Sequence, residues 1–129
     1  MADNESPSIA AYREYANRGI LAVSTINSGA ILAALANIES LRGLDGVTVA
    51  FQAWTVGLAA ATACWLFAYR ANAAYARAHE TCDRLFSALG LLSFVLSLAS
   101  FIWGSWAISA AFNAEAETVA NLSERSADE

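Results

Sequence analysis

The segment Leu85–Phe112 constrains this chain more than any other, because it holds no charged residue, no histidine and no proline over 28 residues. An α-helix rises about 1.5 Å per residue, so a helix of this length would measure about 42 Å. The hydrocarbon core of a bilayer is only about 30 Å thick. The segment is therefore predicted to be a transmembrane helix that exceeds the membrane thickness by a turn or two.

Two further charge-free stretches, Gly19–Ile38 and Val47–Tyr69, each have at least 20 residues, the length that an α-helix needs to cross a bilayer. Because 57% of the chain is hydrophobic and 15% is charged, a soluble protein would lack the polar sequence to cover three such helices. We predict an all-α polytopic membrane protein with three long transmembrane helices, assembled as a homo-oligomer. The spans are expected at about 19–38, 47–69 and 88–110.

The transmembrane domain, residues 19–112, is flanked by two polar segments. Residues 1–18 form an amphipathic lead-in, in which Ser6 and Pro7 suit the N-cap and first position of a helix. The lead-in either lies on the inner leaflet or continues directly into the first span. Its length and acidic residues predict a retained helix rather than a cleaved signal peptide. The acidic tail, 113–129, is expected to add another turn or two of helix.

The second and third helices are predicted to form a hairpin that protrudes into the cytoplasm over residues 70–87. No glycine or proline occurs between residues 58 and 89, so nothing ends the second helix at the membrane surface. A chain reversal is expected near Thr81–Asp83. A hairpin about that turn would place Arg70 level with Leu92.

The charge distribution predicts an orientation. All seven positive charges are arginine, and a cytoplasmic N-terminus places five of them inside and two outside. That bias agrees with the positive-inside rule. We therefore predict a multi-pass protein of the bacterial cytoplasmic (inner) membrane, with a cytoplasmic N-terminus and an external C-terminus. Aromatic belts are expected at the outer surface (Phe51, Trp54, Trp103, Trp106) and at the inner surface (Trp65, Phe67, Tyr69).

Small and polar residues on two of the helices form the first candidate site. A row on the third helix follows a spacing of three or four residues and shares one helix face: Gly90, Ser93, Ser97, Ser100 and Gly104. Such a face either packs against another helix or lines a water-filled pore. Asn27, at mid-membrane depth, requires a polar partner, so it either bonds another helix or faces the same pore.

A group of arginine and tyrosine residues on the cytoplasmic side is the second candidate site. Its members are Arg13, Arg18, Arg70, Tyr75, Arg77 and Arg84. Guanidinium groups bind phosphates and aromatic rings stack on bases, so this group is a candidate site for an anionic ligand or partner. The same residues are also typical of an ordinary positive-inside membrane surface.

A resemblance to a known kind of protein rests on three features. These are the stretch Ile26-Asn-Ser-Gly-Ala-Ile-Leu-Ala-Ala-Leu, the hairpin rich in arginine and alanine, and the serine row of the third helix. Together they resemble small bacterial membrane channel effectors of phage defence, such as the membrane effector of the Hailong system. The resemblance implies a tetrameric ion channel that a DNA oligomer holds shut, partnered with the nucleotidyltransferase that makes this signal.

The expected function is that of a homo-oligomeric membrane pore or ion channel, gated from the cytoplasmic side. Its expected partners are copies of itself, the lipid bilayer, and a single-stranded DNA or nucleotide signal with the enzyme that produces it. The chain has one histidine and no CxxC or paired-carboxylate motif, so we expect no enzyme, no cofactor and no metal site. Two alternatives stay open: a structural subunit of a larger membrane complex, and a holin-like lysis pore.

Overall fold

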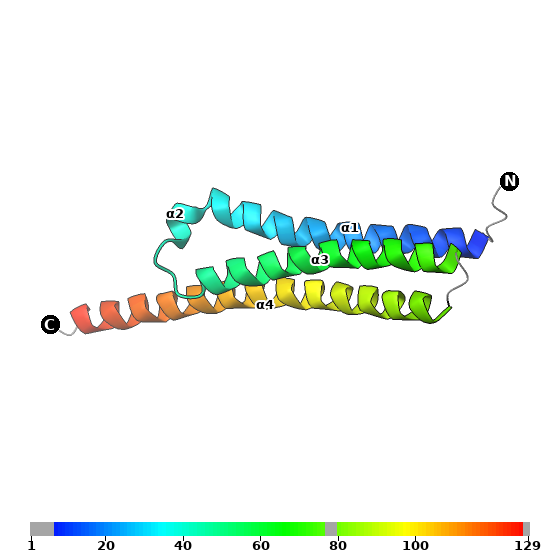
Figure 1. The fold of residues 1–129 in the computed structure, drawn as a ribbon. Coiled ribbons are helices and arrows are strands. Elements are labelled where there is room, and N and C mark those ends of the chain that lie inside the picture. Colours follow the sequence, from blue (N-terminus) through cyan, green and yellow to red (C-terminus); the bar gives the residue numbers. More distant parts are fainter. Residues whose placement is uncertain (1–6, 77–79, 128–129) are drawn as a thin grey trace.

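The computed structural model describes residues 7–76 and 80–127, and all their regular secondary structure is helical. The elements are α1 (Pro7–Ala36), α2 (Ile38–Leu41), α3 (Val47–Ala76) and α4 (Glu80–Ala127), drawn in Figure 1. Three of these helices are long and apolar enough to cross a membrane. The prediction of an all-α chain with three long apolar helices is confirmed for the described residues.

The three long helices lie side by side along the length of the molecule (Figure 1). α3 and α4 run antiparallel and pack against each other, while α1 lies mainly on α3 and touches α4 less. The start of α1, the end of α3 and the start of α4 lie at the same end of the bundle. α2 and the segment that joins it to α3, which together we call the α2 loop, lie at the other end. The chain therefore runs the length of the bundle three times.

The amphipathic lead-in is the first part of the first long helix. α1 runs without interruption from Pro7 to Ala36, so the lead-in continues directly into the apolar stretch. Proline suits the first turn of a helix, where its missing N–H has no intrahelical partner. α3 likewise runs past Tyr69 to Ala76, as the absence of glycine and proline predicts.

The expected position of the chain reversal is wrong by a few residues. α4 begins at Glu80, so Thr81–Asp83 lies inside its first turn. The sequence has no glycine or proline there, and the residues on both sides favour helix. No residue type therefore indicates where one helix ends and the next begins. The register shifts accordingly: Gly90 faces Phe67 and Ser97 bonds to Gly57. Arg70 therefore lies level with residues 85–87 rather than with Leu92.

This register changes the explanation of the long charge-free segment of α4. In this register the surplus length is divided between both ends of the α3 stretch, and at one end it lies against the loop between α2 and α3. Gly46 lies directly on α4 there, because a Cβ at this position would be 3.0 Å from the carbonyl oxygen of Ala107. Gly43 and Gly46 have φ values of 93° and 97°, a conformation that glycine adopts without strain.

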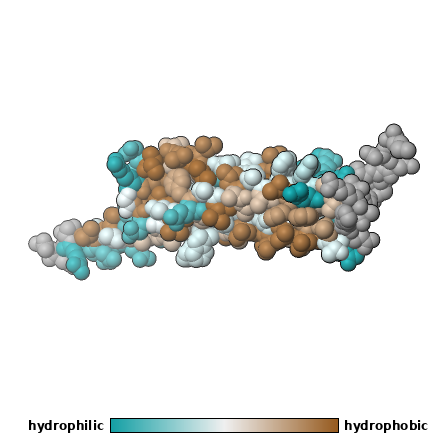
Figure 2. All heavy atoms as spheres, in the orientation of Figure 1, coloured by the Kyte–Doolittle hydropathy of each residue, from teal (hydrophilic) through white to brown (hydrophobic). Residues whose placement is uncertain are grey.

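Trp54 does not belong to the aromatic belt. Its side chain is only 5% exposed and packs in a buried cluster near the loop. Trp65, Trp103 and Trp106 are each more than half exposed. Apolar side chains cover much of the face shown in Figure 2, as expected for helices surrounded by lipid.

The C-terminal part of α4 is longer than predicted. The helix continues to Ala127, about four turns beyond Phe112 rather than one or two. Residues 113–125 are all exposed, and this part of α4 extends beyond the other helices (Figure 1). Alanine and glutamate are strong helix formers, and no glycine or proline interrupts this segment.

Candidate functional site

A polar contact joins the three long helices near the middle of the bundle. It consists of Asn27 from α1, Gly57 from α3 and Ser97 from α4. The midpoints of the three charge-free stretches are residues 28–29, 58 and 98–99, so each contact residue lies within two residues of a midpoint. The three stretches are thus in register with one another, as helices crossing the same bilayer must be.

Hydrogen bonds satisfy most polar atoms of this contact. The Asn27 amide donates to Ser97 Oγ at 3.2 Å and to the carbonyl oxygen of Val23 in its own helix at 2.8 Å. The Ser97 hydroxyl in turn donates to the carbonyl oxygen of Gly57 at 2.7 Å. Both side chains are completely buried. Asn27 therefore bonds to another helix of its own chain in this structure.

The Asn27 Oδ1 atom is buried and accepts no conventional hydrogen bond. It lies against Gly57, where a Cβ on Gly57 would overlap it. Weak Cα–H···O contacts recur at helix–helix interfaces, and this position allows one between Gly57 Cα and Oδ1. Only glycine leaves room for the asparagine side chain at this point.

The row of small residues on α4, which we call the inner α4 row, packs against α3. Four of its members are buried and Ser93 is half-buried: Gly90, Ser93, Ser97, Ser100 and Gly104. Gly104 admits the ring of Trp54, because a Cβ there would be 2.5 Å from Trp54 Nε1. That indole donates to the carbonyl oxygen of Phe101 at 3.4 Å. Within one protomer, the row forms a helix-packing interface.

A second face of α1 lies opposite the buried one. Its residues are spaced by three or four positions and all are exposed: Arg18, Ala22, Thr25, Gly29, Leu32 and Ala36. We call this set the outer α1 face. A Cβ added to Gly29 would meet no atom within 4 Å. Sequence reasoning missed this face, because it singled out Asn27, which lies on the buried side of α1.

The arginine group is brought to one end of the bundle. Arg13 and Arg18 lie near the start of α1, Arg70 near the end of α3 and Arg84 near the start of α4. Arg18 pairs with Glu14, and both side chains are more than 60% exposed. Arg77 and the side chain of Tyr75 lie outside the described residues.

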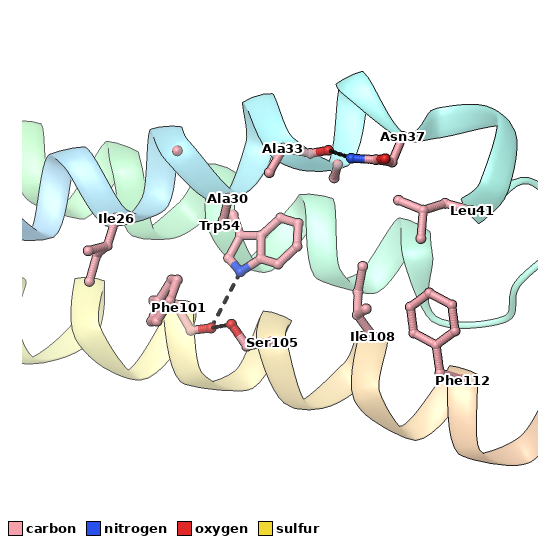
Figure 3. A pocket seen from close by; sticks show the side chains of 12 residues that line it. Ile26, Ala30, Ala33, Asn37, Leu41, Trp54, Phe101, Ser105, Ile108 and Phe112 are labelled. Atoms are coloured by element: carbon pink, nitrogen blue, oxygen red, sulfur yellow. Dashed lines mark hydrogen bonds between the residues drawn. The ribbon is translucent and has the colours of Figure 1, made fainter.

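A laterally open groove of about 610 Å³ separates α1 from α4 in the half of the bundle nearest the α2 loop. Figure 3 shows Ala30 and Ala33 on its α1 side, Phe101, Ser105 and Ile108 on its α4 side, and Trp54 between them. No sequence pattern predicted this groove. It arises because Asn27 holds α1 close to α4 at mid-length, whereas Trp54 keeps the two helices apart farther along.

Metal-ligating side chains and cysteines are the remaining groups to place. Residues 7–76 and 80–127 contain no group of three or more His, Cys, Asp or Glu side chains arranged to hold a metal ion. The two cysteines are unpaired: Cys64 is buried in α3 and Cys82 is exposed on α4.

Comparison with known proteins finds no matching family model, no similar curated protein and no similar solved structure.

Proposed function

We propose that the chain is the subunit of a homo-oligomeric membrane pore, in which the outer α1 face lies toward the symmetry axis. The observation that supports this proposal is that face itself. Its small residues follow the same spacing as the inner α4 row, yet they are exposed in the protomer. Small residues at such spacing let helix backbones approach closely inside a membrane.

A ring of protomers would give every copy of this face the same environment. Most soluble and membrane homo-oligomers close by rotational symmetry, which repeats one contact around an axis. Ala22, Thr25 and Gly29 would then surround an uncharged path that carries one hydroxyl per subunit. The larger apolar side chains of α3 and α4 would face lipid.

In this proposal, the arginine group at the start of α1 is the gate. Four arginines from α1, α3 and α4 share that end of the bundle, and rotational symmetry would multiply them around the axis. Phosphate-rich ligands, such as a nucleotide or a single-stranded DNA oligomer, match this charge. A phage-defence effector controlled by such a signal is the biological role that the resemblance favours.

The proposed orientation places the arginine-rich end in the bacterial cytoplasm and the α4 extension outside. A reporter that is active only in the cytoplasm should be inactive when fused after Glu129. The same reporter fused before Met1 should be active. The opposite pattern would contradict the orientation and would move the gate to the external side.

Cysteine labelling tests the pore directly. In a Cys64→Ala, Cys82→Ala background, Thr25→Cys should react with a small water-soluble thiol reagent in conducting liposomes, and the reaction should block current. Val95→Cys is the matched control, since it lies at the same depth on an exposed part of α4. It should stay unreactive because it faces lipid.

Two results would contradict the proposal. If purified protein were monomeric and did not conduct, the outer α1 face would serve a different protein, as in a structural subunit of a larger complex. If the oligomer conducted but Thr25→Cys stayed unreactive, the path would lie elsewhere in the assembly.

A further inference from the structure

We infer that the groove between α1 and α4 binds one acyl chain of a membrane phospholipid, with the headgroup at the α2 loop. This inference goes beyond the proposed function and holds whether or not the protein conducts. It rests on the position, the chemistry and the shape of the groove.

The groove occupies one half of the membrane-spanning part of the bundle. It begins beside Ile26 and Phe101, close to the midplane contact, and ends beside Asn37 and Phe112. The distance from Ile26 to Asn37 along α1, and from Phe101 to Phe112 along α4, is 11 residues, or about 16 Å of helix. One leaflet contributes about half of a hydrocarbon core that is about 30 Å thick. The length of the groove therefore matches the depth of one leaflet.

The lining of the groove is mostly apolar, and its few polar side chains are already engaged with the protein backbone. Its three polar side chains donate to backbone carbonyl oxygens of the protein itself. Ser105 Oγ and Trp54 Nε1 both reach Phe101 O, at 2.9 and 3.4 Å, and Asn37 Nδ2 reaches Ala33 O at 2.8 Å. The rest of the lining is glycine, alanine, leucine, isoleucine and phenylalanine. An apolar occupant suits this surface, and water would find few partners.

The dimensions favour a chain over a helix. A volume of about 610 Å³ lies within the range of small-molecule sites. An α-helix with its side chains is about 10–12 Å across and needs small residues on the surface that receives it. Here the floor is Trp54, and the α4 wall carries Phe101 and Ile108 (Figure 3). A flexible hydrocarbon chain can follow such a surface.

A second, more polar cavity identifies the end that holds the headgroup. This cavity has a volume of about 390 Å³, lies at the α2 loop and shares Leu41 with the groove. Glu39 and Arg42 line it, 3.8 Å apart and both more than 80% exposed. Arg42 can bind a phosphate, and Glu39 can bind the ammonium group of a zwitterionic headgroup. The two cavities together have the amphipathic form of a phospholipid.

Fluorescence quenching tests the acyl chain directly. A protein that keeps Trp54 alone (Trp65→Phe, Trp103→Phe, Trp106→Phe) would be reconstituted in vesicles that contain phospholipids brominated near the end of the acyl chain. Trp54 lines the groove and is otherwise buried, so only a chain that enters the groove comes close to its ring. We expect strong quenching of Trp54, because bromine atoms on a chain inside the groove contact the ring.

Matched substitutions separate the groove from the surrounding lipid. Ser105→Leu fills the groove from the α4 wall and should remove most of the quenching. Ser109→Leu, one turn away on an exposed surface outside the groove, should keep it. Ala30→Leu fills the groove from the α1 wall and should repeat the loss, which guards against a folding defect in either variant alone.

The outcomes are decisive in both directions. Absence of quenching in the single-tryptophan protein would overturn the inference and would leave the groove to a second copy or another protein. Equal quenching in the Ser105→Leu and Ser109→Leu variants would overturn it as well, because the quenching lipid would then lie outside the groove. Bromine atoms near the chain end should quench Trp54 more than bromine atoms near the ester. The reverse order would contradict the headgroup position.

Discussion

The inner α4 row and the outer α1 face carry the same sequence pattern but have different surroundings. Both consist mainly of small residues spaced by three or four positions inside a charge-free stretch. The α4 row packs against α3, where Gly104 admits the ring of Trp54. The α1 face is exposed along its whole length. The inner α4 row therefore packs within the protomer, whereas the outer α1 face is free to contact another protomer.

This difference shows what small-residue spacing can and cannot say. The spacing predicts that two helices approach each other, because small side chains permit close backbone contact. It does not specify whether the second helix belongs to the same chain. The structure answers that question for α4, and the predictions below test it for both faces.

The largest expected effect is that of Ser97→Leu. The side chain is completely buried and bonds to Gly57, so leucine would overpack the centre of the bundle at a cost of about 1–3 kcal/mol. The protomer itself should lose stability, which thermal unfolding followed by circular dichroism in detergent would measure. Ser109→Leu, on the exposed side of α4, is the control and should unfold near the wild-type temperature. A stable Ser97→Leu oligomer with reduced conductance would instead place Ser97 in a pore.

A pair of glycine substitutions compares the two faces with the smallest possible side chain. Gly104→Ala should destabilise the protomer by about 1–3 kcal/mol, because the new Cβ collides with Trp54. Gly29→Ala meets no atom within 4 Å and should stabilise the isolated protomer by about 0.4–1 kcal/mol through the unfolded state. Equal losses of stability in both variants would mean that the two faces are packed alike.

Two asparagines, one in α1 and one directly after it, give a smaller contrast. Asn27→Leu removes hydrogen bonds to Ser97, and interhelical bonds in membranes contribute about 0.6 kcal/mol each on average. Asn37 is exposed and its side chain donates only to the carbonyl oxygen of Ala33 in the described structure, so Asn37→Leu should change stability less. Denaturant titration of both variants in the same detergent would measure the difference. If Asn37→Leu were the more damaging, the midplane contact would not stabilise the bundle.

The smallest expected effect on stability is that of Arg18→Gln, at the end of the outer α1 face. Its ion pair with Glu14 is exposed and spaced i,i+4, so its loss should cost at most about 0.5 kcal/mol. Oligonucleotide binding should respond more clearly. If Arg18 contacts a phosphate, the slope of log affinity against log salt should fall by about one unit. An unchanged slope would remove Arg18 from the ligand site.

The sequence predicted the helical architecture well, because charge-free stretches of membrane length allow few alternatives. It also singled out Asn27, because a mid-membrane amide needs a polar partner. The α4 row was singled out because its small residues share one helix face. The turn before Glu80 was misplaced by a few residues, since alanine-rich sequence continues across it without a helix-ending residue. Trp54 was assigned to a belt because tryptophan is common there, whereas Gly104 fifty residues later gives it room inside.

The groove and the outer α1 face could not be predicted by the same reasoning. The groove depends on how far apart Trp54 and Asn27 hold two helices, which no single segment encodes. The outer α1 face is defined by its position opposite Asn27, whose side of α1 is buried. Both features are properties of packing between segments distant in sequence.

The C-terminal extension of α4 separates charge from the membrane surface. From Phe112, where the charge-free segment ends, Glu124 lies 12 residues away, which is about 18 Å along a continuous helix. At physiological ionic strength the Debye length is about 8 Å. The repulsion of anionic headgroups therefore acts on Glu115 and Glu117 near the base but is screened at Glu124. In a membrane, the tip of α4 therefore lies in an electrostatic environment that depends little on lipid composition.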